Sequence, residues 1–178
     1  MKKLFFLFLL TASTITAFDA SAQKMPEDKS KRLSPPDSVI VTTHKGITIK
    51  INYGSPSVKG RAIGGNELAT YGKVWRSGAN EATVFEINKD VKIEGKLLPA
   101  GKYSLYSLPG EKKWIIIFNK TWNQWGTVYD PTKDALRVTV NTGTAPEFTE
   151  RLKYFAKKTG KVGFIWGDVR VAFKVKKT

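Results

Sequence analysis

The sequence predicts a single all-β domain, an antiparallel β-sandwich or jelly roll with little helix. Three observations predict it. Apolar and polar residues alternate with a period of two in several segments, as in residues 47–53. Turns containing glycine or proline separate roughly ten such segments. No apolar pattern with the helical period extends beyond a turn or two.

The first 22 residues are expected to be an export signal. Two lysines precede an apolar run at residues 4–10, and residues 20–22 (Ala-Ser-Ala) have the small-x-small pattern of a signal peptidase site. The run is too short to span a bilayer, and no transmembrane segment is expected in the mature chain. We expect cleavage after Ala22 and a periplasmic or secreted protein. Because the chain has no cysteine, a lipid anchor is not expected.

The remaining chain divides into a leader and one domain. Residues 23–37 are polar and basic and end in two prolines, so they are predicted to be a flexible leader that packs against nothing. Residues 38–178 are predicted to form the sandwich, which is long enough to bury a stable core without disulfides. The absence of cysteine also excludes thiol nucleophiles and thiolate metal sites.

The strands follow from the alternating segments. They are predicted, in chain order, at residues 39–42, 47–53, 83–87, 91–93, 103–108, 114–118, 136–140 and 152–154. Residues 114–118 are apolar on both faces, which is typical of a central strand. Residues 54–65, the glycine loop, are too rich in glycine for a regular element. Residues 66–71 could form one helical turn.

The C-terminal residues are predicted to form a hairpin around a Gly167-Asp168 turn. The opposed pairs would be Trp166 with Val169, Phe164 with Val171, and Val162 with Phe173. All six are apolar, as expected for residues that share a buried face.

The formal net charge of +15 favours anionic partners such as acidic glycans or phospholipid headgroups. The alternative is that lysines scattered along the strands provide solubility and prevent edge-to-edge aggregation. Nucleic acid is not an expected partner, because the cations form no block and no recognition motif is present. No feature of the sequence specifies an oligomeric state.

The first candidate site lies in residues 71–83, the arginine loop. Arg76 could form a bidentate pair with a carboxylate, either of Glu81 or of a ligand. Asn80 offers both a donor and an acceptor. We predict that Arg76, Asn80 and Glu81 bind a ligand. In the alternative interpretation, Arg76 and Glu81 form an ion pair that pins the loop, and Trp75 fills the core.

Two further segments could contribute to the same site. Residues 119–131, the tryptophan loop, carry Trp122 and Trp125, which could form a stacking platform for a sugar or could cover the end of the sandwich. In the glycine loop, Lys59 and Arg61 could hold an anion beside backbone amides, although no Walker pattern is present.

No catalytic residue, metal site or cofactor is predicted. His44 is the only histidine, and no GxSxG motif is present. The leading hypothesis is a non-catalytic module that binds a small polar or anionic ligand such as a glycan. One alternative is a hydrolase that uses Glu81, with Asp130 as a candidate second carboxylate. Another is an envelope scaffold that contacts a protein through the tryptophan loop.

Five segments in series carry a family resemblance. They read YGSPSVKGR, YGKVWRSGANEAT, LPAGKYSLYSLPG, FNKTWNQWG and YDPTKDALRV. Together they resemble domain-of-unknown-function family 2911, found in exported bacterial proteins, from about residue 34 to residue 175. The resemblance implies one fold unit and export. It implies no activity and no catalytic residue.

Overall fold

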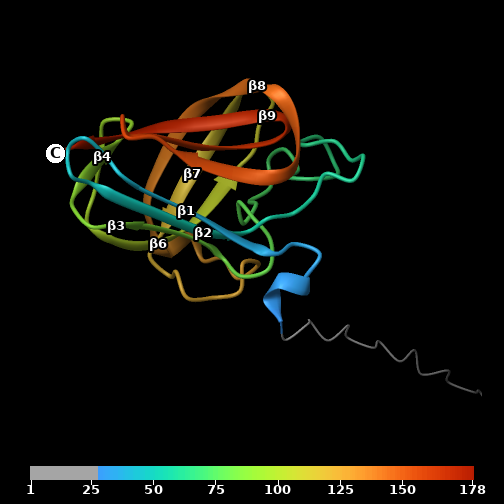
Figure 1. Cartoon of the computed structure of the whole chain (residues 1–178), viewed down its shortest axis with the longest axis horizontal. Helices are drawn as coiled ribbons and strands as arrows, with labels where there is room; N and C mark the ends of the chain where they lie inside the picture. The colour runs from blue at the N-terminus through green and yellow to red at the C-terminus, as the bar shows by residue number, and fades with distance from the viewer. Residues whose placement is uncertain (1–27) are drawn as a thin grey trace, which may run out of the picture.

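The computed structural model describes residues 28–178 of the 178-residue chain. The predicted export signal, residues 1–22, lies outside the described residues, as do residues 23–27. The elements, in chain order, are η1 (Lys29–Lys31), β1 (Pro36–Thr42), β2 (Thr48–Gly54), β3 (Thr83–Ile87), β4 (Val91–Ile93), β5 (Lys96–Leu98), β6 (Gly101–Leu108), β7 (Lys113–Asn119), η2 (Pro131–Lys133), β8 (Asp134–Ala156) and β9 (Lys161–Lys177). This confirms the all-β prediction (Figure 1).

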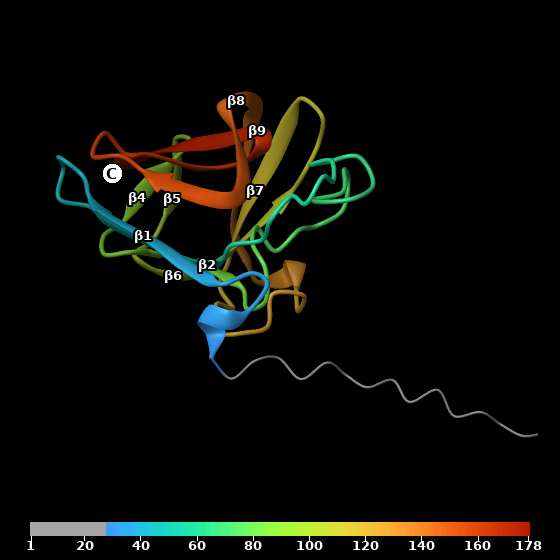
Figure 2. The same ribbon diagram turned by 45° about the vertical axis from the view of Figure 1, so that its right-hand side comes forward.

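The strands form one antiparallel sheet in the order β1-β2-β3-β6-β7-β8-β9-β4-β5. The sheet folds over on itself, so that β8 and β9 lie across the core from β2 and β3 (Figures 1 and 2). Ser57, just after β2, forms an antiparallel bridge to Arg151 in β8. The His44 N–H, just after β1, donates to the Lys158 carbonyl beyond β8. These contacts bring the far half of β8 against the β1–β2 end of the sheet.

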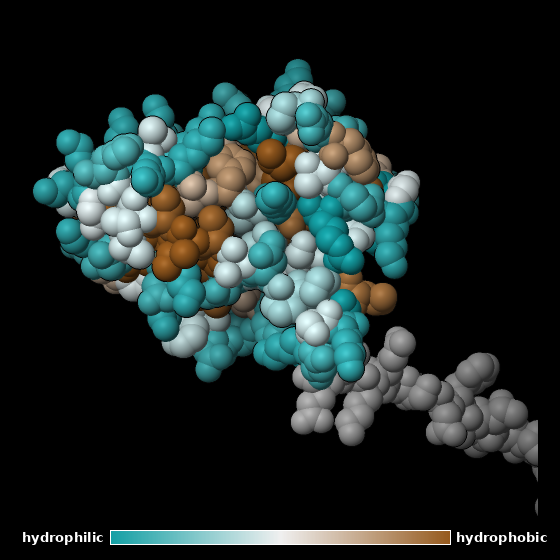
Figure 3. Space-filling model, in the orientation of Figure 1, coloured by the Kyte–Doolittle hydropathy of each residue, from teal (hydrophilic) through white to brown (hydrophobic). Residues whose placement is uncertain are grey.

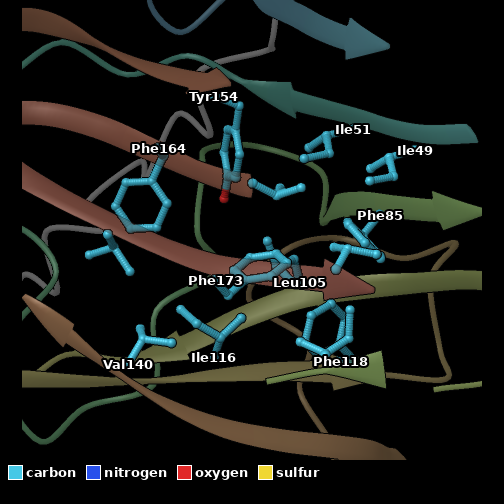
Figure 4. Packing of buried hydrophobic residues seen from close by; sticks show 14 of the residues in the cluster. Ile49, Ile51, Phe85, Leu105, Ile116, Phe118, Val140, Tyr154, Phe164 and Phe173 are labelled. Atoms are coloured by element: carbon cyan, nitrogen blue, oxygen red, sulfur yellow. The ribbon is translucent and has the colours of Figure 1, made fainter. Parts of the chain in front are cut away.

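The core lies between the two layers. Its side chains come from the alternating positions that the sequence predicts, and many are aromatic (Figure 4). Phe85 of β3 and Phe118 of β7 pack edge to face with ring centroids 5.1 Å apart, and Phe173 of β9 meets both. The Ile49 and Ile51 side chains are fully buried beside them. Edge-to-face packing suits the ring quadrupoles and adds to the area that these side chains bury.

The predicted C-terminal hairpin is wrong. β9 continues through Gly167, which bends it at φ +55°, and both halves of β9 pair with β8 instead of with each other. The chain reverses earlier, at residues 157–160, where the Gly160 N–H donates to the Lys157 carbonyl. The two halves of β9 do approach each other. A Cβ atom at Gly163 would lie 2.1 Å from the Val171 oxygen, so only glycine fits there.

Two smaller predictions are also wrong. Residues 66–71 form a turn, with a bridge between Ile63 and Leu68, and no helix. The part of the leader from residue 28 onwards packs against the domain. Pro36 already belongs to β1, and the Pro35 carbonyl accepts from the Ser55 N–H. The backbone carbonyls of a polar segment need partners when they lie against a sheet, and the domain supplies them here.

Candidate functional site

The arginine loop and the tryptophan loop lie against each other. The Gly126 N–H donates to the Asn80 carbonyl at 3.0 Å, and Glu81 forms an antiparallel bridge with Trp125. The two loops flank β6: the arginine loop leads into β3 at Thr83, which pairs with Leu105, and the tryptophan loop leaves β7 at Asn119, which pairs with Ser104. The structure therefore brings together two of the three segments that the sequence singles out.

The glycine loop lies apart from that site. The Lys59 N–H donates to Glu150 Oε1 at 2.9 Å, and the Arg61 side chain donates to the Val58 carbonyl at 3.0 Å. Arg61 lines a separate pocket beside Phe148 of β8. Lys59 and Arg61 therefore do not join the residues of the arginine loop. The Lys59 contact fastens the glycine loop to β8, and the Arg61 contacts stay within the glycine loop.

Glu81 pairs with the N-terminal segment and not with Arg76. Arg32 Nη1 lies 3.0 Å from both carboxylate oxygens, and Lys29 Nζ lies 3.0 Å from one of them. Burial alone would raise the pKa of Glu81, but hydrogen bonds from Lys29 and Arg32 outweigh it and lower the pKa to about 2. Glu81 is therefore an ionised structural group at neutral pH, and the expected Arg76–Glu81 pair does not form.

Asn80 also has a structural partner. Its Nδ2 donates to the Ser34 carbonyl at 2.8 Å, and its backbone adopts φ +64°, which asparagine tolerates better than most residues. With Glu81, it ties residues 29–34 to the arginine loop.

Arg76, by contrast, meets no carboxylate partner in the part of the chain that the structure describes. It takes part in none of the ion pairs among residues 28–178. Its side chain is half-buried, and burial lowers the pKa of its guanidinium, with Tyr106 as the only opposing influence. Arginine keeps its charge under such a shift, because its ordinary pKa lies far above neutral pH. A partly desolvated cation thus lies in the wall of a pocket of about 340 Å³, the Arg76 pocket.

One wall of the Arg76 pocket is Trp75, which reaches from the arginine loop into the core. Its ring stacks on Trp166 at 5.2 Å with an interplanar angle of 10°, and it meets Trp114 edge to face at 6.0 Å. Backbone bonds in both directions join Trp75 to Ser107 of β6. These contacts fix the indole, so that the wall is preformed.

Tyr106 and Tyr129 also line the Arg76 pocket, and their ring centroids are 4.7 Å apart. Their hydroxyls are already engaged. Tyr106 donates to the Val128 carbonyl, and Tyr129 donates to Asp134 Oδ2 at 2.8 Å. Burial, and then the bond to Asp134, raises the pKa of Tyr129 to about 12. The rings, tilted by 55° to each other, therefore provide an apolar surface and no further acid–base chemistry near neutral pH.

Gly126 completes the Arg76 pocket. A Cβ atom there would lie 2.6 Å from Arg76 Cδ and 2.8 Å from the Asn80 oxygen, so a side chain would displace the arginine. Tyr106, Gly126 and Tyr129 were missed at the sequence level. A signal for Tyr106 was present, because residues 103–107 place aromatic side chains on both faces of one strand.

The two predicted platform tryptophans lie on the surface outside the Arg76 pocket. Trp122 is 39% exposed and Trp125 is 42% exposed. Lys102 Nζ lies 4.9 Å from the centroid of the Trp122 ring, a cation–π contact. The indoles are thus neither sealed in the core nor part of the pocket that contains Arg76.

Residues 28–178 contain no cluster of three or more His, Cys, Asp or Glu side chains suited to a metal ion. Within the same range no helix has the length and apolar character needed to cross a membrane.

The comparison with protein families matches residues 34–175 to DUF2911, described as a protein of unknown function. The chain belongs to the DUF2911 family. The match confirms the resemblance carried by the five segments and includes both loops of the Arg76 pocket. Comparisons with curated proteins and with solved structures find no match.

Proposed function

We propose that this DUF2911 protein is an exported, non-catalytic binding module that holds a small carboxylate, such as an acidic sugar, in the Arg76 pocket. One observation carries the proposal: Arg76 is a half-buried cation that has no carboxylate partner among residues 28–178.

A desolvated charge without a partner raises the free energy of the folded state, so proteins normally pair such groups. The Arg32–Glu81 pair shows that this domain does so elsewhere. A ligand carboxylate would supply the missing charge, and the planar guanidinium can bind it through two parallel hydrogen bonds. The net charge of +15 would draw such an anion towards the protein.

The walls of the Arg76 pocket favour a ligand with a flat apolar face. Trp75 is fixed by its stacking on Trp166, and the engaged hydroxyls of Tyr106 and Tyr129 leave their rings as the contact surface. Sugar rings offer apolar C–H faces together with polar edges, and Thr127 at the rim could bond to such an edge. A hexuronate such as glucuronate combines such a ring with a carboxylate.

A hydrolase that uses Glu81 is less well supported. A general acid must hold a proton near the working pH, whereas two cations lower the pKa of Glu81 to about 2. Asp130 cannot readily serve as its partner, because its carboxylate accepts from the Thr132 N–H and hydroxyl.

Isothermal titration calorimetry with glucuronate and with glucose tests the proposal. We expect heat from glucuronate and none from glucose. The Arg76→Lys variant, which keeps the charge but loses the planar fork, should bind roughly tenfold more weakly, and Arg76→Met should not bind detectably. Arg61→Lys, an arginine outside the pocket, is the matched control and should bind as the wild type does. Equal binding of glucuronate by Arg76→Met would overturn the proposal.

A second candidate is a scaffold that contacts a protein through the tryptophan loop. The exposure of Trp122, Trp125 and Val128 on one loop favours it. Elsewhere on the face shown in Figure 3, hydrophobic residues form separate patches among hydrophilic ones. Size-exclusion chromatography with light scattering tests self-association: a dimer lost in Trp125→Ala, with glucuronate binding intact, would favour the scaffold.

A further inference from the structure

The outer surface of β8 and β9 carries a second cavity, of about 590 Å³, that shares no residue with the Arg76 pocket. It lies where the two strands separate. Thr142 pairs with Val171, but the preceding part of β8 pairs with β7 while the end of β9 pairs with β4. Gly143 and Ala172 lie among its lining residues, and their small side chains leave the space open.

Three cations line this cavity: Lys161, Arg170 and Lys174. None of them takes part in the ion pairs among residues 28–178. The one carboxylate in the lining, Glu94, already accepts from the Lys174 backbone N–H at 2.6 Å. The cavity therefore has an excess of positive charge within a concave surface, which concentrates the attraction for anions.

The cations are held on strands and not on mobile loops. The Arg170 guanidinium lies 5.3 Å from the centroid of the Phe155 ring, and Phe155 in turn covers Gly163. The end of β9 meets the turn that precedes β9 next to the lysines, because the Val175 N–H donates to the Gly160 carbonyl at 2.8 Å. This bond holds Lys161, which follows Gly160, close to Lys174, which precedes Val175.

The polar residues beside the cations indicate which groups a bound anion would carry besides its charge. Thr139, Asn141 and Thr144 of β8 line the cavity and offer hydroxyl and amide groups. Lysines act as point charges towards oxyanions of more than one charge, and arginine adds a fork for two oxygens. Hydroxyls and amides suit the hydroxyl edges of a sugar.

We propose that this cavity binds a sugar that carries a phosphate or sulfate ester. Lys161, Arg170 and Lys174 contact the ester oxygens, and the β8 side chains contact the sugar hydroxyls. The proposal is independent of the Arg76 pocket, since the two cavities have no residue in common.

Calorimetry with glucose 6-phosphate, glucose 6-sulfate and glucose tests the proposal. Binding of an ester, with no binding of glucose, is the expected result. The two esters distinguish a phosphate site from a sulfate site. Phosphate gains its second charge near pH 6, so a phosphate site should bind its ester more tightly as the pH rises from about 5 to 7.5. Binding of the sulfate ester should stay constant over this range. Binding of neither ester, or equal binding of glucose, would overturn the proposal.

Variants locate the binding. Gly143→Leu fills the cavity, and its Cβ meets only the Arg170 oxygen at 3.6 Å, an ordinary contact, so the fold should persist. We expect this variant and Lys161→Gln/Lys174→Gln to bind at least tenfold more weakly, with unchanged circular dichroism. Lys153→Gln, which removes a charge from β8 outside the cavity, should stay within twofold of the wild type. Unchanged ester binding by Gly143→Leu would overturn the assignment, and Arg76→Met should leave ester binding intact.

Discussion

Arg32 and Arg76 both lie against residues of the arginine loop, but their surroundings differ. The Arg32 side chain is only 11% exposed, and its Nη1 lies 3.0 Å from both oxygens of Glu81. Arg76 is half-buried among aromatic rings and faces a pocket with no carboxylate in its lining. The first arginine is neutralised by Glu81, and the second forms no ion pair within residues 28–178.

This difference separates a structural ion pair from a candidate binding group. Removing one partner of a buried ion pair destabilises the fold, because the remaining charge stays desolvated. A buried charge without a partner already carries that cost, so its removal should relieve the fold. The two arginines should therefore respond to substitution with opposite signs of stability change.

The largest effect is expected from Glu81→Gln, which leaves Arg32 without a countercharge. We expect the free energy of unfolding to fall by about 2 kcal/mol, below the range for a fully buried pair because the Glu81 side chain is 44% exposed. Urea unfolding measures it. Glu86→Gln is the matched control, since its 3.8 Å contact with Lys102 is exposed, and it should lose about 0.5 kcal/mol or less. Equal losses of unfolding free energy in Glu81→Gln and Glu86→Gln would contradict the view that the Arg32–Glu81 pair is a structural ion pair.

The next effect is the pH dependence of the same pair. The folded-state pKa of Glu81, about 2, lies below its ordinary value of 4.5, so its contribution to stability is complete above about pH 5 and is lost as the pH falls towards 2. Solvent screening limits the change to about 1–2 kcal/mol. The stability difference between the wild type and Glu81→Gln, measured by urea unfolding at several pH values, should shrink over this range. A constant difference would contradict the assignment.

Arg76→Met should give a smaller change of opposite sign. Methionine keeps the aliphatic volume and removes the desolvated charge, so we expect stability to rise by about 1 kcal/mol. Arg76→Lys keeps the charge and should give no such gain. Thermal and urea unfolding of both variants measure it. A loss of stability in Arg76→Met would mean that the fold already compensates this charge.

The fold was largely predictable from the sequence because the signal is local. The alternation in residues 47–53 reports directly which side chains of β2 face the core. The hairpin at Gly167 failed because alternation shows which face is buried and not which strand lies alongside. Both halves of β9 pair with β8. Strand pairing of this kind depends on long-range contacts, which a local sequence pattern does not report.

The candidate site was predictable in part for the same reason. The sequence located Arg76, and the two loops do meet, but the partner of Glu81 was expected from within its own loop. Arg32, 49 positions earlier, took that role because residues 28–37 pack against the domain. That contact is long-range and appears in no local sequence pattern. The sequence alone therefore could not show that Glu81 would pair with Arg32 and leave Arg76 without a carboxylate among residues 28–178.

The smallest effect is expected from Lys29→Gln. Lys29 Nζ lies as close to Glu81 as Arg32 does, at 3.0 Å, but its side chain is 57% exposed. An exposed pair gains little over hydration, so we expect a loss of about 0.5 kcal/mol or less that disappears in about 1 M NaCl. Urea unfolding at low and high salt measures it, with the more exposed Lys31→Gln as control. Lys29 and Arg32 lie equally close to Glu81 and differ in burial. If Lys29→Gln lost as much stability as Glu81→Gln, the burial of Arg32 would not explain why its pair with Glu81 is the important one.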